Sequence, residues 1–311
     1  MIIFFPIYRG FLTGQENTSE KLYGLVISSV TSLRRFFHFQ KAIENMSQKS
    51  QETESWHVVG TISELIELLI LEERLPEAVA YYNEAINILF GAGFDSPEKI
   101  KKKSKLLSFK TKNKLVSIKL ELARLYHKLD DLTNEKKSLD DAILLIFNEA
   151  FTAYAGKEIL ENYRQEIKIP QWLSAEEVYS TLGWVADFYQ SHDNPWYSIP
   201  LYQAAIHFCK VPIKRAILLC NLGSTCYMIG EISHAVKFFT EGLAILSEDQ
   251  SSQDESLNAK ATILFNLAMT YEANAEIEKS QKVFEQLWSM KKQFSQLSAE
   301  KQSLVQSRLI S

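Results

Sequence analysis

The order of side-chain sizes in residues 217–246, "ILLCNLGSTCYMIGEISHAVKFFTEGLAIL", restricts the fold more than any other feature of the chain. A Leu-Gly pair (Leu222, Gly223) opens the order, and a small, a large and a small residue follow at Ala235, Phe239 and Gly242. These intervals place each set on one face of a helix. Small residues let two helices approach closely, and large ones fill the gap to a neighbour. The segment therefore reads as a helical hairpin that buries its apolar face only by stacking.

Four other segments repeat this order. The Leu-Gly position is filled by Leu267-Ala268, Val185-Ala186, Leu122-Ala123 and, less well, Leu65-Ile66. An aromatic follows at Tyr271, Tyr189 and Tyr126, with Cys226 and Leu69 as departures. In the second helix the small residues are Ala78, Ser198, Ala235 and Ser280, the large ones Tyr82, Leu139, Tyr202, Phe239 and Phe284, and the next small ones Ala85, Ala142, Ala205 and Gly242.

The copies cover residues 59–92, 116–149, 179–212, 216–249 and 261–294. Their pattern resembles the tetratricopeptide repeat (TPR), a pair of antiparallel helices of about 34 residues. The resemblance implies an all-α fold, a superhelical TPR solenoid of about five helical hairpins with capping helices.

The two ends of the chain differ from the repeats. Residues 295–311 are predicted to be a C-terminal capping helix, with Phe294, Leu297, Leu304 and Ile310 on its apolar face. Residues 1–34 form an apolar segment, either membrane-proximal or the first helix of a degenerate repeat, and residues 35–294 form the solenoid. No run of eighteen apolar residues exists, so neither apolar piece near the start spans a bilayer by itself.

Composition excludes several classes of protein. The net charge of −4 provides no basic field for a nucleic acid. Cys209, Cys220 and Cys226 lack CxxC spacing and fall in predicted helices, which argues for small core residues rather than disulfides or zinc ligands. With 11 Gly and 7 Pro placed between helical stretches, the chain is expected to be all-helical.

Local signals predict where some helices begin and end. Asp95 or Ser96 before Pro97 indicates a helix start, and Ser174 with Glu177 forms a capping box. The segment "SHDNPW" (191–196) is expected to be an interhelix turn, and residues 247–256 a flexible loop. The eight lysines of residues 99–114 fit either a solvated helix extension or a site for anionic lipid or an acidic partner.

No motif predicts an enzyme. The chain has no glycine-rich phosphate loop, no GxSxG and no HExxH, and we expect no cofactor. The six histidines do not pair at metal-ligand spacing, so no metal site is predicted, and His207 is expected to be a core histidine.

In TPR solenoids the first helix of each hairpin lines a groove that holds extended or helical peptide segments, as the resemblance implies. Two adjacent columns of first-helix positions are the predicted partner-binding groove, with His127 and Tyr227 beside them: Glu64, Glu121, Trp184, Asn221 and Asn266, then Glu67, Arg124, Asp187, Ser224 and Met269. Asn221 and Asn266 either hold a peptide backbone or only bond neighbouring hairpins. Arg124 is the one strong cation expected there, which disfavours the carboxylate clamp of chaperone-binding TPR domains. A mixed, partly apolar groove fits unfolded or extended protein segments.

A closer resemblance rests on "IPQWLSAEEVYSTLGWVADFYQSHDNPWYSIPLYQAAIHFC" (169–209), "AILLCNLGSTCYMIGE" and "FFHFQKAIENM". These stretches resemble fungal mitochondrial TPR adaptors of the inner-membrane i-AAA protease. The resemblance implies a non-enzymatic adaptor for protein quality control, at the inner membrane and facing the intermembrane space, that presents unfolded clients to AAA protease subunits. We also expect weak membrane association through the N-terminus, and we expect no nucleic acid as a partner. The alternative is a soluble TPR scaffold that joins folded partners in a cytoplasmic or nuclear complex.

Overall fold

The structure is a computed structural model, and it describes residues 52–90, 97–149, 151, 160, 168–248, 254–295 and 297–310. This part of the chain contains thirteen α-helices and no β-strand. The described residues divide at residue 150 into two compact units, here called the N-terminal and C-terminal units. None of the helices in the described ranges combines the length and apolar content needed to cross a bilayer. The predicted segment 1–34 lies outside the described residues.

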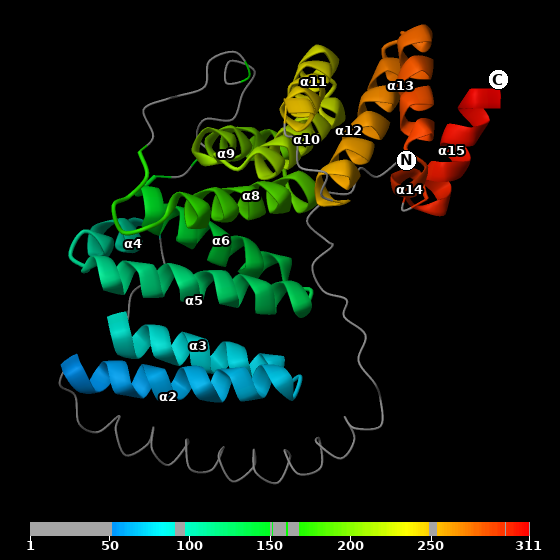
Figure 1. Cartoon of the computed structure of the whole chain (residues 1–311). Helices are drawn as coiled ribbons and strands as arrows, with labels where there is room; N and C mark the ends of the chain where they lie inside the picture. Colours follow the sequence, from blue (N-terminus) through cyan, green and yellow to red (C-terminus); the bar gives the residue numbers. More distant parts are fainter. Residues whose placement is uncertain are drawn as a thin grey trace. The chain divides into compact units, whose positions relative to one another are not determined.

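The N-terminal unit consists of two helical hairpins and one short helix (Figure 1). The first hairpin joins α2 (Glu52–Leu71) to α3 (Leu75–Phe90), and the second joins α5 (Phe109–Lys128) to α6 (Leu132–Phe147). The short helix α4 (Pro97–Ser104) packs on α6. Leu125 of α5 packs into the core of the first hairpin against residues such as Leu65 and Ala85, so the two hairpins share apolar contacts.

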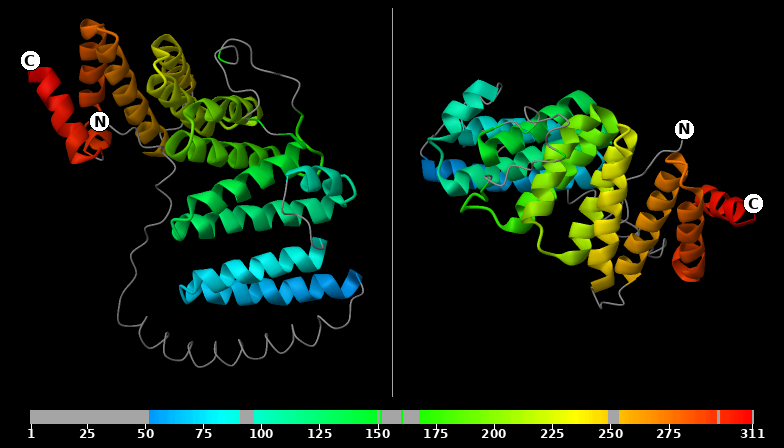
Figure 2. Two further views of the ribbon diagram at one scale, coloured as in Figure 1. Left: turned by 180° about the vertical axis from the view of Figure 1, so that it is seen from behind. Right: turned by 90° about the horizontal axis from the view of Figure 1, so that it is seen from above.

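The C-terminal unit contains three hairpins and a closing pair of helices, seen from two further sides in Figure 2. The hairpins pair α8 (Ala175–His192) with α9 (Pro195–Phe208), α10 (Pro212–Met228) with α11 (Ile232–Glu248), and α12 (Asp254–Ala273) with α13 (Ile277–Ser289). The short helix α14 (Lys291–Phe294) and α15 (Ala299–Ile310) follow. Helices α10 and α11 both contact α12, so consecutive hairpins stack side by side.

The predicted packing positions lie inside these hairpins, and each of the five predicted copies overlaps one hairpin of the described residues, beginning four to seven residues after the start of its first helix. Ala78, Ala142, Ala205 and Ala235 are each 0% exposed. At Gly223 of α10 an added Cβ would lie 2.8 Å from the Phe239 ring of α11, so only glycine allows this approach. Small residues therefore set the helix spacing, as the sequence pattern predicted.

Four of the hairpins share one turn. In each, the second residue after the first helix has a left-handed backbone: Glu73 (φ 60°), Asp130 (φ 58°), Gly230 (φ 82°) and Ala275 (φ 59°). The amide of the next residue bonds to the carbonyl five residues earlier, over 2.8 to 2.9 Å, in the pairs Arg74–Leu69, Asp131–Tyr126, Glu231–Cys226 and Glu276–Tyr271. This pattern is the Schellman helix end. The α8–α9 hairpin is different, because only Asp193 and Asn194 separate its helices.

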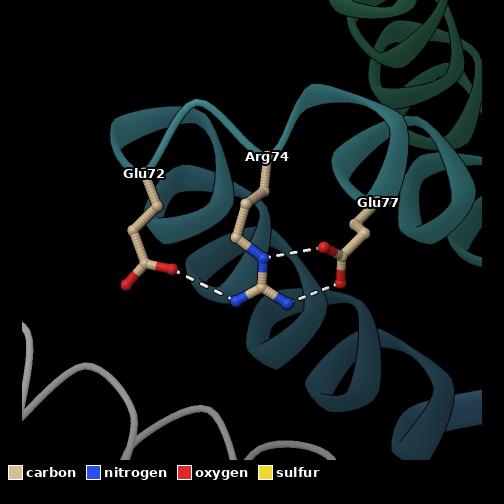
Figure 3. Close-up of polar contacts among 3 residues, drawn as sticks. All are labelled: Glu72, Arg74 and Glu77. Atoms are coloured by element: carbon tan, nitrogen blue, oxygen red, sulfur yellow. Dashed lines mark hydrogen bonds and ion pairs between the residues drawn. The ribbon is translucent and has the colours of Figure 1, made fainter.

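The turn of the first hairpin carries an exposed charge cluster (Figure 3). The Arg74 guanidinium donates from Nε and Nη2 to both Glu77 oxygens, over 2.7 and 2.6 Å, and from Nη1 to Glu72 over 3.2 Å. These carboxylates hold the pKa of Arg74 above its usual range, and Arg74 holds the pKa of Glu77 below its own. Exposed pairs of this kind contribute about 0–1 kcal/mol, so the cluster positions the turn more than it stabilises the unit.

Most of the predicted boundaries are confirmed. Helix α4 begins at Pro97, Ser174 and Glu177 form both bonds of a capping box, and Asn194 caps α9 in the predicted turn. All three cysteines are reduced and buried. The loop predicted at 247–256 is too long, because α11 continues to Glu248 and α12 begins at Asp254. The prediction for His207 is wrong, since it lies on the exposed side of α9.

Helix α15 runs parallel to α12. The Lys301 ammonium lies 4.9 Å from the centre of the Phe265 ring, and Arg308 Nε lies 2.8 Å from Glu272 Oε1. The two contact residues on α12 are seven positions apart, and so are their partners on α15, in the same order along the chain. Helix α15 therefore takes the position that the first helix of a further hairpin would occupy. Val305, which the apolar pattern did not select, is its most buried residue, at 0% exposed. Leu297 and Leu304 pack at the edge of the same cluster.

Candidate functional site

In the N-terminal unit, the predicted groove residues lie at the surface. Glu64 and Glu67 of α2 are exposed, as are Arg124 and His127 of α5. Glu121 forms an ion pair with Arg124 one turn away. These side chains, with Tyr82 of α3 beside them, are here called the α2–α5 face. It carries three carboxylates and one guanidinium, so its local charge is negative.

Tyr82 marks the point where the two hairpins meet on this face. Burial, with a smaller contribution from the charges of Glu121 and Glu67, raises the pKa of Tyr82 to about 12, and Arg124 opposes the rise. The phenol therefore stays protonated at neutral pH and can donate a hydrogen bond. His127 Nδ1 lies 3.2 Å from Glu135 Oε2, so one side of the ring faces a buried carboxylate and the other faces solvent.

In the C-terminal unit, most residues of the same columns are buried. Asn221 is 2% exposed, Ser224 6%, Asn266 4% and Met269 8%. Trp184 and Tyr227 are partly exposed. Asp187 is partly exposed as well, so the side chains that reach the surface in this part of the columns are two aromatic rings and one carboxyl group.

The two asparagines bond neighbouring hairpins. Asn221 Nδ2 donates to Asp187 Oδ1 over 3.1 Å, from α10 to α8. Asn266 Nδ2 lies 3.3 Å from Ser224 Oγ and 3.4 Å from Cys220 Sγ, from α12 to α10. Of the two roles that the sequence left open for these residues, the bonding of hairpins is therefore the one seen in the structure. Contact with a partner remains a prediction for every member of the columns.

A buried polar network centres on Asp187. Tyr202 OH lies 2.5 Å from Asp187 Oδ1 and 3.1 Å from Gln190 Oε1. Gln190 Nε2 donates to the Asn221 carbonyl over 3.0 Å and to Thr225 Oγ1 over 2.8 Å. The network joins α8 and α9 to α10, and it fixes how these two hairpins pair.

The protonation of Asp187 follows from this geometry. Burial raises the pKa of Asp187 to about 7, and the hydrogen bonds from Tyr202 and Asn221 oppose the rise. When Asp187 is ionised, Asp187 Oδ1 and Gln190 Oε1 can both only accept a hydrogen bond. The Tyr202 hydroxyl has a single proton, so it can donate to only one of these two oxygens at a time. A neutral Asp187 donates to the Tyr202 oxygen and lets the hydroxyl donate to Gln190.

The α2–α5 face and the Asp187 network occupy corresponding positions of the repeat. Tyr82 and Tyr202 fill the same large position, Glu67 corresponds to Asp187, and Glu121 to Asn221. In the C-terminal unit Tyr202 and Asn221 both bond to Asp187, whereas in the N-terminal unit Glu67 is exposed and the partly exposed Glu121 pairs with Arg124. The N-terminal unit is therefore the part where these positions remain accessible to a partner.

Sequence reasoning missed two sets of polar residues. Gln190 and Thr225 complete the network, and Lys119 Nζ forms a buried ion pair with Asp141 Oδ2 over 2.7 Å between α5 and α6. The signal for the pair was present, because Lys119 and Asp141 each interrupt the apolar side of a helix. The network had no such signal, since Gln190 follows Tyr189 at the edge of its helix face.

Reaction chemistry has no support at these positions. Among the described residues, no group of three His, Cys, Asp or Glu side chains could hold a metal ion. Burial raises the pKa of the Cys220 and Cys226 thiols to about 12, so neither is a nucleophile at neutral pH.

Comparison with known proteins agrees with this geometry. The tetratricopeptide repeat family matches residues 261–294, which include α13 and most of α12. A search of curated protein sequences finds no match.

Two solved structures illustrate the general likeness. BtubC (BKLC) from P. vanneervenii is 14% identical with a TM-score of 0.48, over 86% of this chain and 93% of that one. A point variant of nearly identical TPR-like repeats, described as a kinesin light chain from Podosopora anserina, is 14% identical with a TM-score of 0.49, over 77% and 97%. The fold assignment rests on the hairpins and the matched repeat, not on these likenesses.

The chain thus has an all-α TPR fold, and residues 261–294 are one copy of the repeat. This fold is that of a protein–protein interaction scaffold, and the family match indicates no catalytic family.

Proposed function

We propose that this protein is a non-enzymatic adaptor that binds unfolded or extended segments of client proteins and presents them to an AAA protease of the mitochondrial inner membrane. The observation that supports client binding is the α2–α5 face, where Glu64, Glu67 and Arg124 are exposed while the corresponding residues of α10 and α12 are buried. The protease and the location come from the resemblance of residues 169–209 to the fungal adaptors.

The chemistry of the face indicates which client segments it prefers. Three carboxylates and a single guanidinium lie on the first helices α2 and α5, and the protonated phenol of Tyr82 lies beside them on α3. Lysine and arginine side chains of an extended segment would meet this charge, and the phenol would donate to a backbone carbonyl. Client proteins with basic segments should therefore bind more tightly than client proteins without them.

Binding is tested with full-length protein and an unfolded basic model protein, reduced and alkylated lysozyme. The variant Glu64→Gln/Glu67→Gln should bind it roughly fivefold to tenfold more weakly, with less dependence on salt. The matched control Glu278→Gln/Glu285→Gln removes two exposed carboxylates from α13 and should bind as the wild type does. Equal binding by all three proteins would show that the α2–α5 face is not the client site.

Location is tested separately. Fractionation of the tagged full-length protein should place it with mitochondrial membranes, and AAA protease subunits should co-purify. Recovery in the soluble fraction with folded partners alone would instead support the scaffold function.

A further inference from the structure

The surface most unlike the rest of the chain lies where α4 meets α5, at residues 99–114, here called the basic corner. Leu106 is 85% exposed and Phe109 is 57% exposed. A large apolar side chain at such exposure is common singly, but here two lie three residues apart at one turn. They give the corner an apolar tip.

The tip is held in a fixed shape. Ile100 of α4 is 0% exposed and anchors this helix, which packs on α6. The amides of Leu106 and Leu107 bond to the carbonyls of Lys103 and Ser104 over 2.9 and 3.2 Å. Ser108 Oγ accepts the Thr111 amide over 3.2 Å and caps α5. The exposed Leu106 and Phe109 are therefore presented by structured backbone at the junction of two helices.

Lysines surround this tip. Residues 99–114 contain eight lysines and no acidic residue, in a chain whose net charge is −4. Lys101, Lys102, Lys105 and Lys110 are exposed. Among the described residues, no ion pair joins Lys101, Lys102 or Lys105 to a carboxylate. Within the described part of the chain, the positive charges of these three lysines are thus not paired with carboxylates.

We propose that the basic corner docks on the surface of an anionic lipid bilayer, with Leu106 and Phe109 entering the interface and the lysines meeting the headgroups. Both features stabilise binding to an anionic membrane interface, because the interface buries apolar side chains and attracts each nearby lysine. A nucleic acid backbone would use the lysines and leave Leu106 in water, and an acidic protein would need an apolar pocket matched to Leu106 and Phe109, which a bilayer interface does not require. This contact is independent of the client site on the α2–α5 face and of residues 1–34.

Vesicle co-sedimentation tests the proposal with full-length protein. Binding is measured to phosphatidylcholine vesicles that contain about one-third phosphatidylserine and to vesicles of phosphatidylcholine alone, and the first value is divided by the second. Apolar segments that bind both kinds of vesicle equally do not change this ratio. The ratio should exceed one clearly at low salt and fall as salt rises.

Two variants separate charge from apolar insertion. Lys101→Gln/Lys102→Gln/Lys105→Gln should lower binding to anionic vesicles roughly a hundredfold, and Leu106→Ser/Phe109→Ser about tenfold. The matched controls Lys210→Gln/Lys237→Gln/Lys282→Gln and Leu71→Ser/Ile277→Ser change exposed residues elsewhere and should bind as the wild type does.

Insertion is measured directly at the tip. The native cysteines are buried, so a Leu106→Cys variant labels selectively with an environment-sensitive fluorophore. Its emission should shift to the blue on anionic vesicles, whereas the Leu71→Cys label should not respond.

Three outcomes would overturn the proposal. They are a binding ratio of one, normal vesicle binding by the lysine variant, or lysine-dependent binding to poly-glutamate with none to vesicles, which would assign the corner to an acidic protein. Loss of vesicle binding by the lysine variant with normal lysozyme binding would support the docking surface and leave the client site to its own test.

Discussion

Gly223 offers a direct test of how closely the helices of a hairpin must approach. The substitution Gly223→Ala adds one methyl group to α10, where the ideal Cβ lies 2.8, 2.9 and 3.0 Å from three carbons of the Phe239 ring. Carbon atoms in favourable contact lie about 3.5–4.0 Å apart, so each contact is too short by about half an ångström or more. The ring is 0% exposed and packed on all sides, so it has no open space to enter.

Two opposing terms set the size of the effect. Replacing glycine by alanine inside a helix stabilises it by about 1 kcal/mol. Overpacking of a buried site costs about 1–3 kcal/mol. Because the contact at Gly223 is with a rigid aromatic ring, we expect the upper part of that range and a net loss of roughly 1–2 kcal/mol.

The assay is urea unfolding followed by circular dichroism, with Gly183→Ala as the matched control. At Gly183 the added Cβ would meet only Leu218 Cδ2 at 3.2 Å, the end of a flexible side chain. That variant should be within about 0.5 kcal/mol of the wild type or more stable, since the helix term is the same and the clash is small. The double variant Gly223→Ala/Phe239→Leu should be less destabilised than the sum of the two single variants, because the smaller side chain relieves the contact. Equal stability of the two alanine variants would refute the close-approach argument.

Three further substitutions test other parts of the fold by the same measurement. Ala275→Gly should stabilise the protein by about 1 kcal/mol, because Ala275 has φ 59° and glycine adopts that conformation without cost; a loss would contradict the Schellman turn. The folded-state pKa of Asp187 is about 7, above its unfolded value of about 3.9, so its contribution to stability is present below about pH 4 and lost as pH rises towards 7. The free energy of unfolding of Asp187→Asn should not show this dependence on pH. Relative to the wild type it should rise by at most about 4 kcal/mol between pH 4 and 8, and by less if solvent reaches the carboxylate. Parallel stability curves for the two proteins over this pH range would contradict the prediction. Lys119→Met should cost about 3–5 kcal/mol by leaving Asp141 buried alone, and Lys119→Met/Asp141→Leu should restore most of the stability.

The hairpins could be predicted from the sequence because each helix pair needs small residues at fixed intervals. Gly223, Ala235 and Phe239 are recognisable by size, and their positions alone define which helix faces which. The shared turn had no comparable signal. Of its four left-handed residues only Gly230 is glycine, and Glu73, Asp130 and Ala275 adopt that backbone because the helices on either side hold it.

The candidate site was predictable only in part. Helical spacing places Glu64 and Asn266 in one column, but it does not show that Glu64 is exposed whereas Asn266 is buried, with 4% of its surface exposed. Burial depends on what the next hairpin supplies at that point, and hydrogen-bond partners such as Gln190 and Cys220 lie 31 and 46 positions from the residues they contact. A periodic pattern contains no information about such distant pairs.

The Asp187 network also constrains how the sequence can change over generations. Asp187, Tyr202, Gln190 and Asn221 come from three helices, and loss of any one side chain removes at least one of the hydrogen bonds that join them. A lone substitution there therefore removes more stability than the same change on the α2–α5 face. Descendants of this chain should exchange these four residues as a set, while Glu64 and Glu67 vary independently as clients change.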